Sequence, residues 1–455
     1  PQYKKVFDIG TYTGNGGQYR VGIPTLRGQG PGGKQVANSL RFRAGQYLLR
    51  SSDSGGYTGT SSIAFWVKRG KLGSTQIIFS GGQASNSYGY IGFNSSDQVQ
   101  VTDIGSGTTN TSLTTTLAIK DTSIWYHICV AIDTAQSTST NRVKIYVNGI
   151  DQPLSGSYPS LSYGYNLLYI GDKYIGCQGS TSQSPSNYFD GYLAQFYKPD
   201  AGTAYNHTYF TEFNSDNILV PKTFSGSYSG TTAHYFQFAV GAIGTDSSGA
   251  GCNYTPSGFN TTTANTTYDV MTDSPVDYLS GSMTTANNAG NYAVLSSYNK
   301  SSAITLSNGN LYWTGGTSGG GDTFSQIATN MNIPTTGKWF FEMQPQSAGS
   351  DANSFGFNIT RSNRGGNGWP ATRGNLGYPG YYSFEYGLYL GGGSASDTLA
   401  FRNNYVTNAT TTQIATGVVT NVYTAWYGVA IDCDSSTIQM YRNGVALGSP
   451  TSFVH

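Results

Sequence analysis

The sequence predicts an all-β protein, in which two antiparallel jelly-roll β-sandwiches are joined by an irregular connector of strands and coil. Three observations predict this class. Charged residues make up only 10% of the 455 residues, aromatic residues make up 14% with 36 Tyr among them, and one strand–turn–strand pattern occurs twice. Sheets favour Thr, Tyr, Phe, Val and Ile, whereas surface helices need Ala, Leu, Glu, Lys and Arg.

The composition also excludes several classes of protein. Disordered chains lack aromatic residues, which recur along this whole sequence. The formal net charge is +1 and there is no run of Lys or Arg, so we expect no nucleic-acid partner. No stretch approaches 18 uninterrupted apolar residues, which predicts no membrane insertion. No signal peptide opens the chain at Pro1, so either it was removed or the protein leaves its cell another way, for example inside a virus particle.

The repeated pattern predicts two domains of related architecture. Each copy begins with Trp-Tyr, continues as an apolar strand ending in Ala-Ile-Asp and, after a polar turn, forms a second strand ending in Tyr-x-Asn-Gly; the copies fall at residues 125–149 and 426–444. The nearly continuous apolar strand is typical of a central position, and Val143, Ile145 and Val147 alternate onto one face of the next strand. Asn-Gly supplies the positive φ angles of a tight hairpin turn.

The first domain is expected to begin near Val36 and to span residues 36–200 as a sandwich of many short strands. The strands we expect are 39–42, 46–49, 62–68, 76–80, 88–93, 125–133, 143–147, 167–171 and 190–197. The order of the strings SLRF, SIAFWVK, WYHICVAID, KIYVNG, LLYIGD and FDGYLAQFY resembles the laminin-G-like, concanavalin A-like lectin/glucanase sandwich. The resemblance implies a fold that is used for glycan binding.

Residues 201–325 are expected to form a less regular connector. The strings DSSG, CNYTPSG, YDVMTDSPVDY, NYAVL and LSNGNL look like the connector of phage tail and fibre-like proteins, where it follows a laminin-G-like domain and leads into a SPRY-like one. A structureless loop of this length is unusual in a compact domain, so we expect the connector to pack against its neighbours.

Residues 326–455 resemble a SPRY-like sandwich. The resemblance rests on the strand-like stretches at 337–343 and 386–390 and on the run WYGVAIDCDSSTIQMYRNG. Because that fold usually has further strands, we expect the sequence to be a fragment, truncated at its C-terminus. Residues 1–35 resemble the glycine-rich lead-in of the same phage proteins.

The sequence predicts no enzymatic activity. Glycosidases need two carboxylates across the scissile bond, and enzymes of the concanavalin-like fold carry them as Glu-x-Asp-x-x-Glu on one strand. That string is absent, and Glu212, Glu342 and Glu385 lie far apart in the sequence. Of the four His that a Ser/His/Asp triad could use, His127 lies inside a predicted strand, where a structural role is expected.

A long loop of the second domain is the best candidate for a glycan- or receptor-binding site. Such a site needs an exposed aromatic ring to stack on a sugar and polar groups to bond its hydroxyls, and Tyr-rich loops lose little entropy on binding. The candidate residues are Arg364, Asn367, Trp369, Tyr378, Tyr381 and Tyr382. The alternative is that these aromatic rings pack the loop against the sandwich or against a neighbouring subunit. The Tyr-rich residues 158–165 are a second candidate.

No metal site and no other cofactor is predicted. The four Cys show no CxxC spacing, which argues against zinc. Domains of the resembled family sometimes hold Ca²⁺ through loop oxygens, but the sequence has no Asp-x-Asp-x-Asp-Gly loop, so no ligand set is identifiable. The loop-like candidates for Ca²⁺ are Asp53, Asp97, Asp103, Asp172 and Asp190, for which turn formation is the alternative.

The cysteines allow two interpretations. Cys129 and Cys433 lie within strand-like runs, where buried free thiols are expected. A disulfide such as Cys129–Cys177 is the alternative, and the spacing does not decide between the two.

Together these features predict a structural and binding component of a phage virion appendage, such as a tail fibre, that presents its sandwiches to a glycan or protein receptor on the host surface. The resemblance implies a homotrimer, contacts with other virion proteins, and a location on the virion, outside the cell. A secreted cellular adhesin or lectin with the same modules is the main alternative. A pure spacer role also stays open, because a fold does not determine a function.

Overall fold

The computed structural model describes residues 36–56, 58–214, 218–262, 268–275, 292–300, 304–315, 327–329, 338–344, 353–358, 385–390, 399–403, 410–415 and 425–452. These residues fall into two compact units. The sandwich unit lies within residues 24–292 and 306–312, and the C-terminal unit within 293–305 and 313–455. Nearly every described element is a strand, and no described helix has the length and apolar character needed to cross a membrane.

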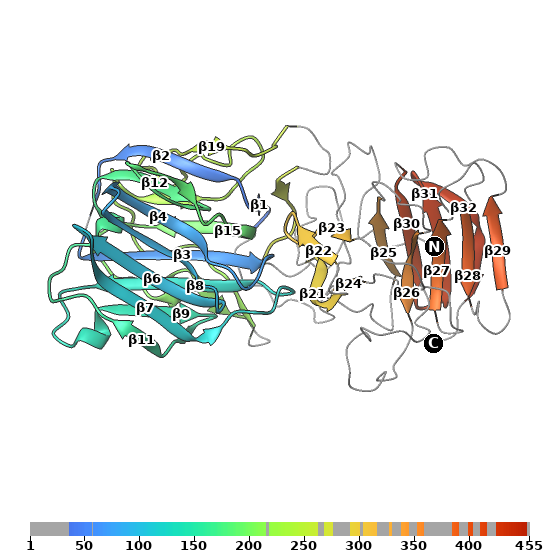
Figure 1. Ribbon diagram of the computed structural model, residues 1–455, viewed down its shortest axis with the longest axis horizontal. Coiled ribbons are helices and arrows are strands. Elements are labelled where there is room, and N and C mark those ends of the chain that lie inside the picture. The colour runs from blue at the N-terminus through green and yellow to red at the C-terminus, as the bar shows by residue number, and fades with distance from the viewer. Residues whose placement is uncertain are drawn as a thin grey trace. The chain divides into compact units, whose positions relative to one another are not determined.

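The sandwich unit contains two antiparallel sheets, each with eight described strands, which run from blue to yellow in Figure 1. The strand order in the first sheet is β10 (Ile150–Asp151), β9 (Val143–Val147), β8 (Tyr126–Asp133), β3 (Thr60–Arg69), β15 (Asp190–Lys198), β1 (Ser39–Arg43) and β20 (Val270–Met271), and β18 (His234–Phe236) also pairs with β15. The order in the second sheet is β11 (Leu154–Ser157), β7 (Thr108–Ala118), β6 (Gln98–Gly105), β5 (Ser87–Phe93), β4 (Gln76–Ala84), β12 (Gly171–Ile175), β2 (Tyr47–Asp53) and β19 (Thr255–Ser257).

Short elements complete the sandwich unit. They are the hairpins β13 (Gln178–Ser180) with β14 (Gln183–Ser186) and β16 (Thr211–Phe213) with β17 (Leu219–Pro221), and the 3₁₀ turns η1 (Ser139–Asn141), η2 (Asn166–Leu168) and η3 (His207–Tyr209). In η3 the side chain of Asn206 accepts a hydrogen bond from the backbone N–H of Thr208, which satisfies one free donor at the start of the turn.

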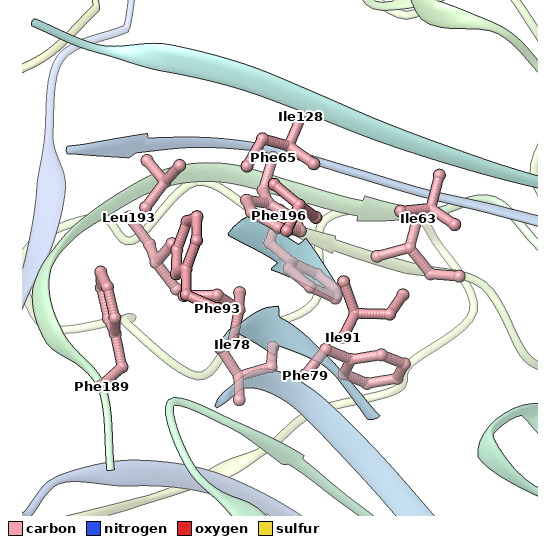
Figure 2. Close-up of a cluster of buried hydrophobic side chains, with 14 of the residues drawn as sticks. Ile63, Phe65, Ile78, Phe79, Ile91, Phe93, Ile128, Phe189, Leu193 and Phe196 are labelled. Carbon is pink, nitrogen blue, oxygen red and sulfur yellow. The ribbon is translucent and has the colours of Figure 1, made fainter. Parts of the chain in front are cut away.

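An apolar core fills the space between the two sheets. Figure 2 shows Phe65 of β3 and Phe196 of β15, from the first sheet, close to Phe79 of β4, from the second. The ring centroids of Phe79 and Phe196 lie 5.2 Å apart, and those of Phe65 and Phe196 lie 6.1 Å apart. All three side chains are buried, and each contributes about 1.5–3 kcal/mol by leaving water.

The predicted repeat is present as two similar hairpins. In the first, β8 pairs with β9, and in the second, β30 (Tyr427–Asp432) pairs with β31 (Thr437–Arg442). Asn148 and Asn443 each have a φ of +48°, and each is followed by a Gly with positive φ. Each Asn-Gly turn follows the second strand of the hairpin and leads into the next strand. Its Asn side chain accepts a hydrogen bond from a backbone N–H at the start of the hairpin, from His127 at 2.8 Å and from Trp426 at 2.9 Å. The Asn-Gly turns and the antiparallel pairing are therefore confirmed.

The described connector residues add strands to both sheets of the sandwich. β18 pairs with β15, β20 with β1, and β19 with β2. Ion pairs formed by the carboxylates on either side of β20 accompany its contact with β1. Asp269, next to β20, bonds Arg43 at 2.8 Å and Arg41 at 3.3 Å, and Asp273 bonds Lys68 of β3 at 2.8 Å. The part of the connector that carries β18, β19 and β20 therefore folds with the sandwich.

The C-terminal unit contains two four-stranded antiparallel sheets among its described residues, which run from orange to red in Figure 1. One has the order β25 (Lys338–Met343), β30, β31 and β32 (Val445–Ser452), and the other β26 (Asn353–Asn358), β27 (Glu385–Leu390), β28 (Leu399–Asn403) and β29 (Thr410–Ala415). The remaining described strands are β21 (Leu295–Lys300), β22 (Ile304–Ser307), β23 (Tyr312–Gly315) and β24 (Ile327–Thr329). The all-β class is therefore confirmed.

One predicted strand is wrong. Residues 167–171 were expected to be extended, but Asn166–Leu168 form the 3₁₀ turn η2 and the strand β12 starts only at Gly171. The buried carboxylate of Asp103 accepts hydrogen bonds from the backbone N–H groups of Asn166 and Leu167, at 3.1 Å and 2.9 Å. This long-range contact favours a turn that the apolar pattern Leu-Leu-Tyr-Ile does not indicate.

Candidate functional site

The first predicted binding loop lies outside the described residues. Its candidate residues are Arg364, Asn367, Trp369, Tyr378, Tyr381 and Tyr382, and the structure describes none of residues 359–384. Their role stays a prediction.

The second predicted loop, residues 158–165, has a packing role. Tyr165 is fully buried in the core of the sandwich, and Tyr158 and Tyr163 pack against that core. The Tyr163 hydroxyl donates a hydrogen bond of 2.7 Å to the buried carboxylate of Asp103, whose pKa is raised by burial. The aromatic rings of this second candidate loop therefore fix it to the sandwich.

The carboxylates considered for Ca²⁺ mostly bond groups of the protein. Asp97 accepts hydrogen bonds from Arg69 and from the backbone N–H of Gly73. Asp172 accepts one from the N–H of Ser52, and Asp190 one from the N–H of Gly309. Asp53 is different, because one of its two oxygens has no such partner. The expectation that these residues lie in loops holds for Asp97, which is in a turn. It is wrong for the other four, which lie within strands: Asp53 in β2, Asp103 in β6, Asp172 in β12 and Asp190 in β15.

The outer face of the second sheet carries a row of aromatic and polar side chains at which the sequence predicts no site. Ile91, Val101 and Leu113 lie opposite one another on β5, β6 and β7 and are fully buried in the core. Side chains alternate along a strand, so the next row, Tyr90, Thr102 and Ser112, points to the outer face of the sheet. Tyr88 of the same strand also points outward.

We call this surface the tyrosine face and define it by Tyr88, Tyr90, Gln100, Ser112 and Thr114. The rings of Tyr88 and Tyr90 are stacked, with centroids 6.3 Å apart, and both are partly exposed. Gln100 lies opposite Thr114, one row from Tyr90. Two aromatic rings thus adjoin hydroxyl and amide groups, which donate and accept hydrogen bonds.

The hairpin of β13 and β14 borders the tyrosine face. Ser80 of β4 lies directly opposite Tyr90, and its hydroxyl donates a hydrogen bond of 2.8 Å to the carbonyl of Cys177 and accepts one of 2.8 Å from the N–H of Gly179. Because Ser80 shares the outer face with Tyr90, these contacts place the hairpin on that face beside the ring. The position of the tyrosine face is fixed by packed strands rather than by a loop.

The four Cys, His127 and His234 are buried, whereas His207 is partly exposed. All four Cys are free and buried, so buried thiols are what the structure shows at these positions. His127 is buried against the rings of Trp66 and Phe210, and burial, with a smaller contribution from His207, lowers its pKa to about 3. This environment agrees with the structural role expected for His127.

One group of side chains among the described residues could hold a metal ion. Asp53, His234 and Cys252 each offer a ligand atom, and these atoms lie within 4.8 Å of one another. The three residues are separated by up to 199 positions in the sequence, so no local sequence motif indicates that they form a group.

Residues 42–201 match a protein-family model described as the concanavalin A-like lectin/glucanases superfamily. This segment forms a concanavalin A-like jelly-roll domain. The predicted laminin-G-like, concanavalin A-like sandwich is confirmed for this part of the chain. The match begins within β1 and ends just after β15, so the concanavalin A-like domain as matched does not include β18, β19 or β20. A search of curated proteins finds no match to the sequence.

Several solved structures are similar to the chain at low identity. A pentraxin from Limulus polyphemus has 14% identity and a TM-score of 0.30 over 38% of this chain and 80% of its own. Domains LG4-5 of the mouse laminin alpha1 chain have 7% identity and a TM-score of 0.30 over 94% and 82%. The CBM40 domain of a Ruminococcus gnavus sialidase has 13% identity and a TM-score of 0.24 over 32% and 87%. At these values the matches identify neither a ligand nor a partner for the concanavalin A-like domain.

Proposed function

We propose that the protein is a binding component that attaches to a glycan, or to a receptor that carries one, through the tyrosine face of its concanavalin A-like domain. The observation that carries this proposal is the outward row of Tyr88 and Tyr90 beside Gln100, Ser112 and Thr114 on a sheet whose other side is the core. The flat faces of the two rings suit the C–H face of a pyranose, and the neighbouring hydroxyl and amide groups suit its hydroxyls.

Binding without catalysis is part of the proposal. The family description that matches residues 42–201 includes glucanases as well as lectins. Catalytic members need a pair of carboxylates beside the bound sugar. The five residues of the tyrosine face carry hydroxyl and amide groups but no carboxylate, so this surface can bind a glycan but has no acid–base pair to cleave it.

We propose further that the chain belongs to a phage virion appendage, such as a tail fibre, as a homotrimer that displays the tyrosine face to the host surface. This proposal is supported by the resemblance of the connector and by the low charge of the chain, and it is separate from glycan binding. Immunogold labelling of purified particles tests it, since label on a virion appendage is expected. Label on a cell surface or in secreted material would instead favour a cellular adhesin or lectin.

Glycan-array binding of the purified full chain tests the tyrosine face. Tyr90→Ala should reduce the signal on every bound glycan by at least about fivefold, if a sugar stacked on one aromatic ring gains the roughly 1–3 kcal/mol that a stacked nucleobase gains. Tyr298→Ala is the matched control, since Tyr298 is 65% exposed and belongs to β21 of the C-terminal unit. Equal binding of Tyr90→Ala and wild type would exclude the tyrosine face as the site.

A further inference from the structure

Three buried side chains from distant parts of the sandwich unit converge on one point. Asp53 ends β2, His234 begins β18, and Cys252 lies in the loop before β19. One oxygen, one nitrogen and one sulfur atom from these residues lie within 4.8 Å of one another, and all three residues are 0% exposed. Buried polar groups normally have hydrogen-bond partners, so the way in which these atoms are satisfied needs an explanation.

Two of the atoms have no hydrogen-bond partner. These are Oδ2 of Asp53 and Nε2 of His234, which face each other at 3.7 Å. This distance is too long for a hydrogen bond. It is close to about 3.4 Å, which is the distance between two ligand atoms that bind the same tetrahedral Zn²⁺ ion at their usual bond lengths. A metal ion between them would satisfy both atoms at once.

The surrounding groups hold the ligand atoms toward that point. The Tyr254 hydroxyl lies 3.1 Å from Nδ1 of His234, so when Nδ1 donates its proton to this oxygen, Nε2 presents a lone pair. Arg50 donates a hydrogen bond of 2.8 Å to Oδ1 of Asp53, which leaves Oδ2 as the free oxygen. Asp246 accepts a hydrogen bond of 3.0 Å from the backbone N–H of Cys252 and so fixes the loop that carries the thiol.

The basic residues near the site have partners of their own. Lys198, directly opposite His234 on β15, pairs with Asp200 at 3.0 Å. The ammonium group of Lys173 donates to the backbone carbonyls of Tyr169 and Gly171. The carboxylate of Asp53 and a Cys252 thiolate together carry the two negative charges that neutralise a divalent ion.

We propose that Asp53, His234 and Cys252 bind a Zn²⁺ ion that joins the edge of the second sheet to the connector. A mixed set of carboxylate, imidazole and thiolate ligands suits Zn²⁺, whereas Ca²⁺ and Mg²⁺ prefer oxygen ligands alone. A water molecule is the simplest fourth ligand. Because the three residues are buried and come from β2, β18 and the loop before β19, the ion has a structural role and is independent of glycan binding.

Metal reconstitution of the purified full chain tests this proposal. The chain is stripped with a chelator, dialysed, and titrated with Zn²⁺ or Co²⁺ alone. We expect one Zn²⁺ per chain by elemental analysis, a rise in the melting temperature with Zn²⁺, and a thiolate-to-cobalt charge-transfer band with Co²⁺. A folded wild-type chain that shows no charge-transfer band would overturn the proposal without any variant.

Two cysteine variants then locate the ion. Cys252→Ala should lose the cobalt band and bind Zn²⁺ at least tenfold more weakly, because it lacks the sulfur ligand. Cys177→Ala is the matched control, since Cys177 is also a fully buried free thiol but does not belong to the group of three ligand residues. A band that persists in Cys252→Ala, or one that disappears in Cys177→Ala, would overturn the assignment.

Discussion

The ion pair between Lys68 and Asp273 allows a quantitative test of how firmly the connector is joined to the sandwich. Lys68 is fully buried in β3, and Asp273 follows β20 and is 5% exposed. One Asp273 oxygen accepts from Lys68 at 2.8 Å, and the other accepts from the indole N–H of Trp125 at 2.9 Å. Asp273→Asn removes the charge and keeps an oxygen for Trp125, and its amide N–H then faces Lys68, which can accept from it only as the neutral amine.

The expected cost follows from two independent bounds. Removing one partner of a buried ion pair typically costs about 3–5 kcal/mol. The loss of unfolding free energy also has an upper limit, because the chain can fold with Lys68 as the neutral amine. Folding with a neutral lysine costs about 1.4 kcal/mol for each pH unit below the ordinary pKa of 10.5, hence about 4.8 kcal/mol at pH 7. We therefore expect Asp273→Asn to lower the free energy of unfolding of the sandwich unit by about 3–5 kcal/mol at pH 7.

The pH dependence of this loss tests the reasoning. Burial lowers the pKa of Lys68, and Asp273 opposes that effect, so without Asp273 the folded chain holds a neutral lysine over a wider pH range. The unfolded chain still binds that proton up to pH 10.5, so the variant regains stability as the pH rises, at up to about 1.4 kcal/mol per pH unit. At pH 9 the remaining loss should be about 2 kcal/mol.

Hydrogen exchange of peptides from β3 and β15 in the full chain measures this free energy for the sandwich unit alone. The matched control is Asp151→Asn, because Asp151 pairs with Lys144 at 3.1 Å but both side chains are more than a third exposed. That pair should contribute less than about 1 kcal/mol. A loss below 1 kcal/mol in Asp273→Asn, or a loss that does not shrink between pH 7 and pH 9, would refute the argument.

Three further predictions concern single residues. Burial lowers the pKa of His127 to about 3, so between pH 6.5 and pH 3 the unfolded chain binds a proton at this residue that the folded chain does not bind. The folded form therefore loses stability as the pH falls below about 6.5. His127→Leu should reduce the slope of the unfolding free energy against pH in this range by up to about 1.4 kcal/mol per pH unit. Asn148 has a positive φ, and its side chain accepts a hydrogen bond from the N–H of His127. Asn148→Ala should therefore lower the free energy of unfolding by about 2 kcal/mol, and Asn148→Gly, which tolerates the positive φ, by about 1 kcal/mol. Urea denaturation measures both values, and equal losses would contradict this separation. Trp369→Ala should weaken attachment to host cells without unfolding the protein, and unchanged attachment in a cell-binding assay would exclude that loop as the site.

The sequence was sufficient to predict the features that depend on local patterns. The repeated hairpin could be predicted because its strands alternate and its Asn-Gly turns demand positive φ. Val143, Ile145 and Val147 are buried as expected, and β8 lies inside its sheet between β3 and β9. Most of the other expected strands of the first domain are present within a few residues of their predicted bounds.

Features that depend on contacts between distant segments could not be predicted in this way. The strands β18, β19 and β20 have two or three residues each, too few to show a period. The tyrosine face follows from the register of β5, β6 and β7, which no single strand reveals. The convergence of Asp53, His234 and Cys252 depends on the connector folding back on both sheets. The absence of CxxC spacing argued against zinc, but this spacing identifies only sites whose ligands lie close together in the sequence.

The way in which the connector completes the sandwich has a consequence for how such chains evolve. The family match ends at residue 201, but residues after that point supply edge strands to both sheets and the acid that neutralises Lys68. A genetic exchange with its boundary at residue 201 would separate a buried lysine from its counter-ion and leave the edges of β1, β2 and β15 uncovered. We therefore expect viable recombinants to inherit the sandwich and the connector together, with crossover points that fall before Val36 or after the connector.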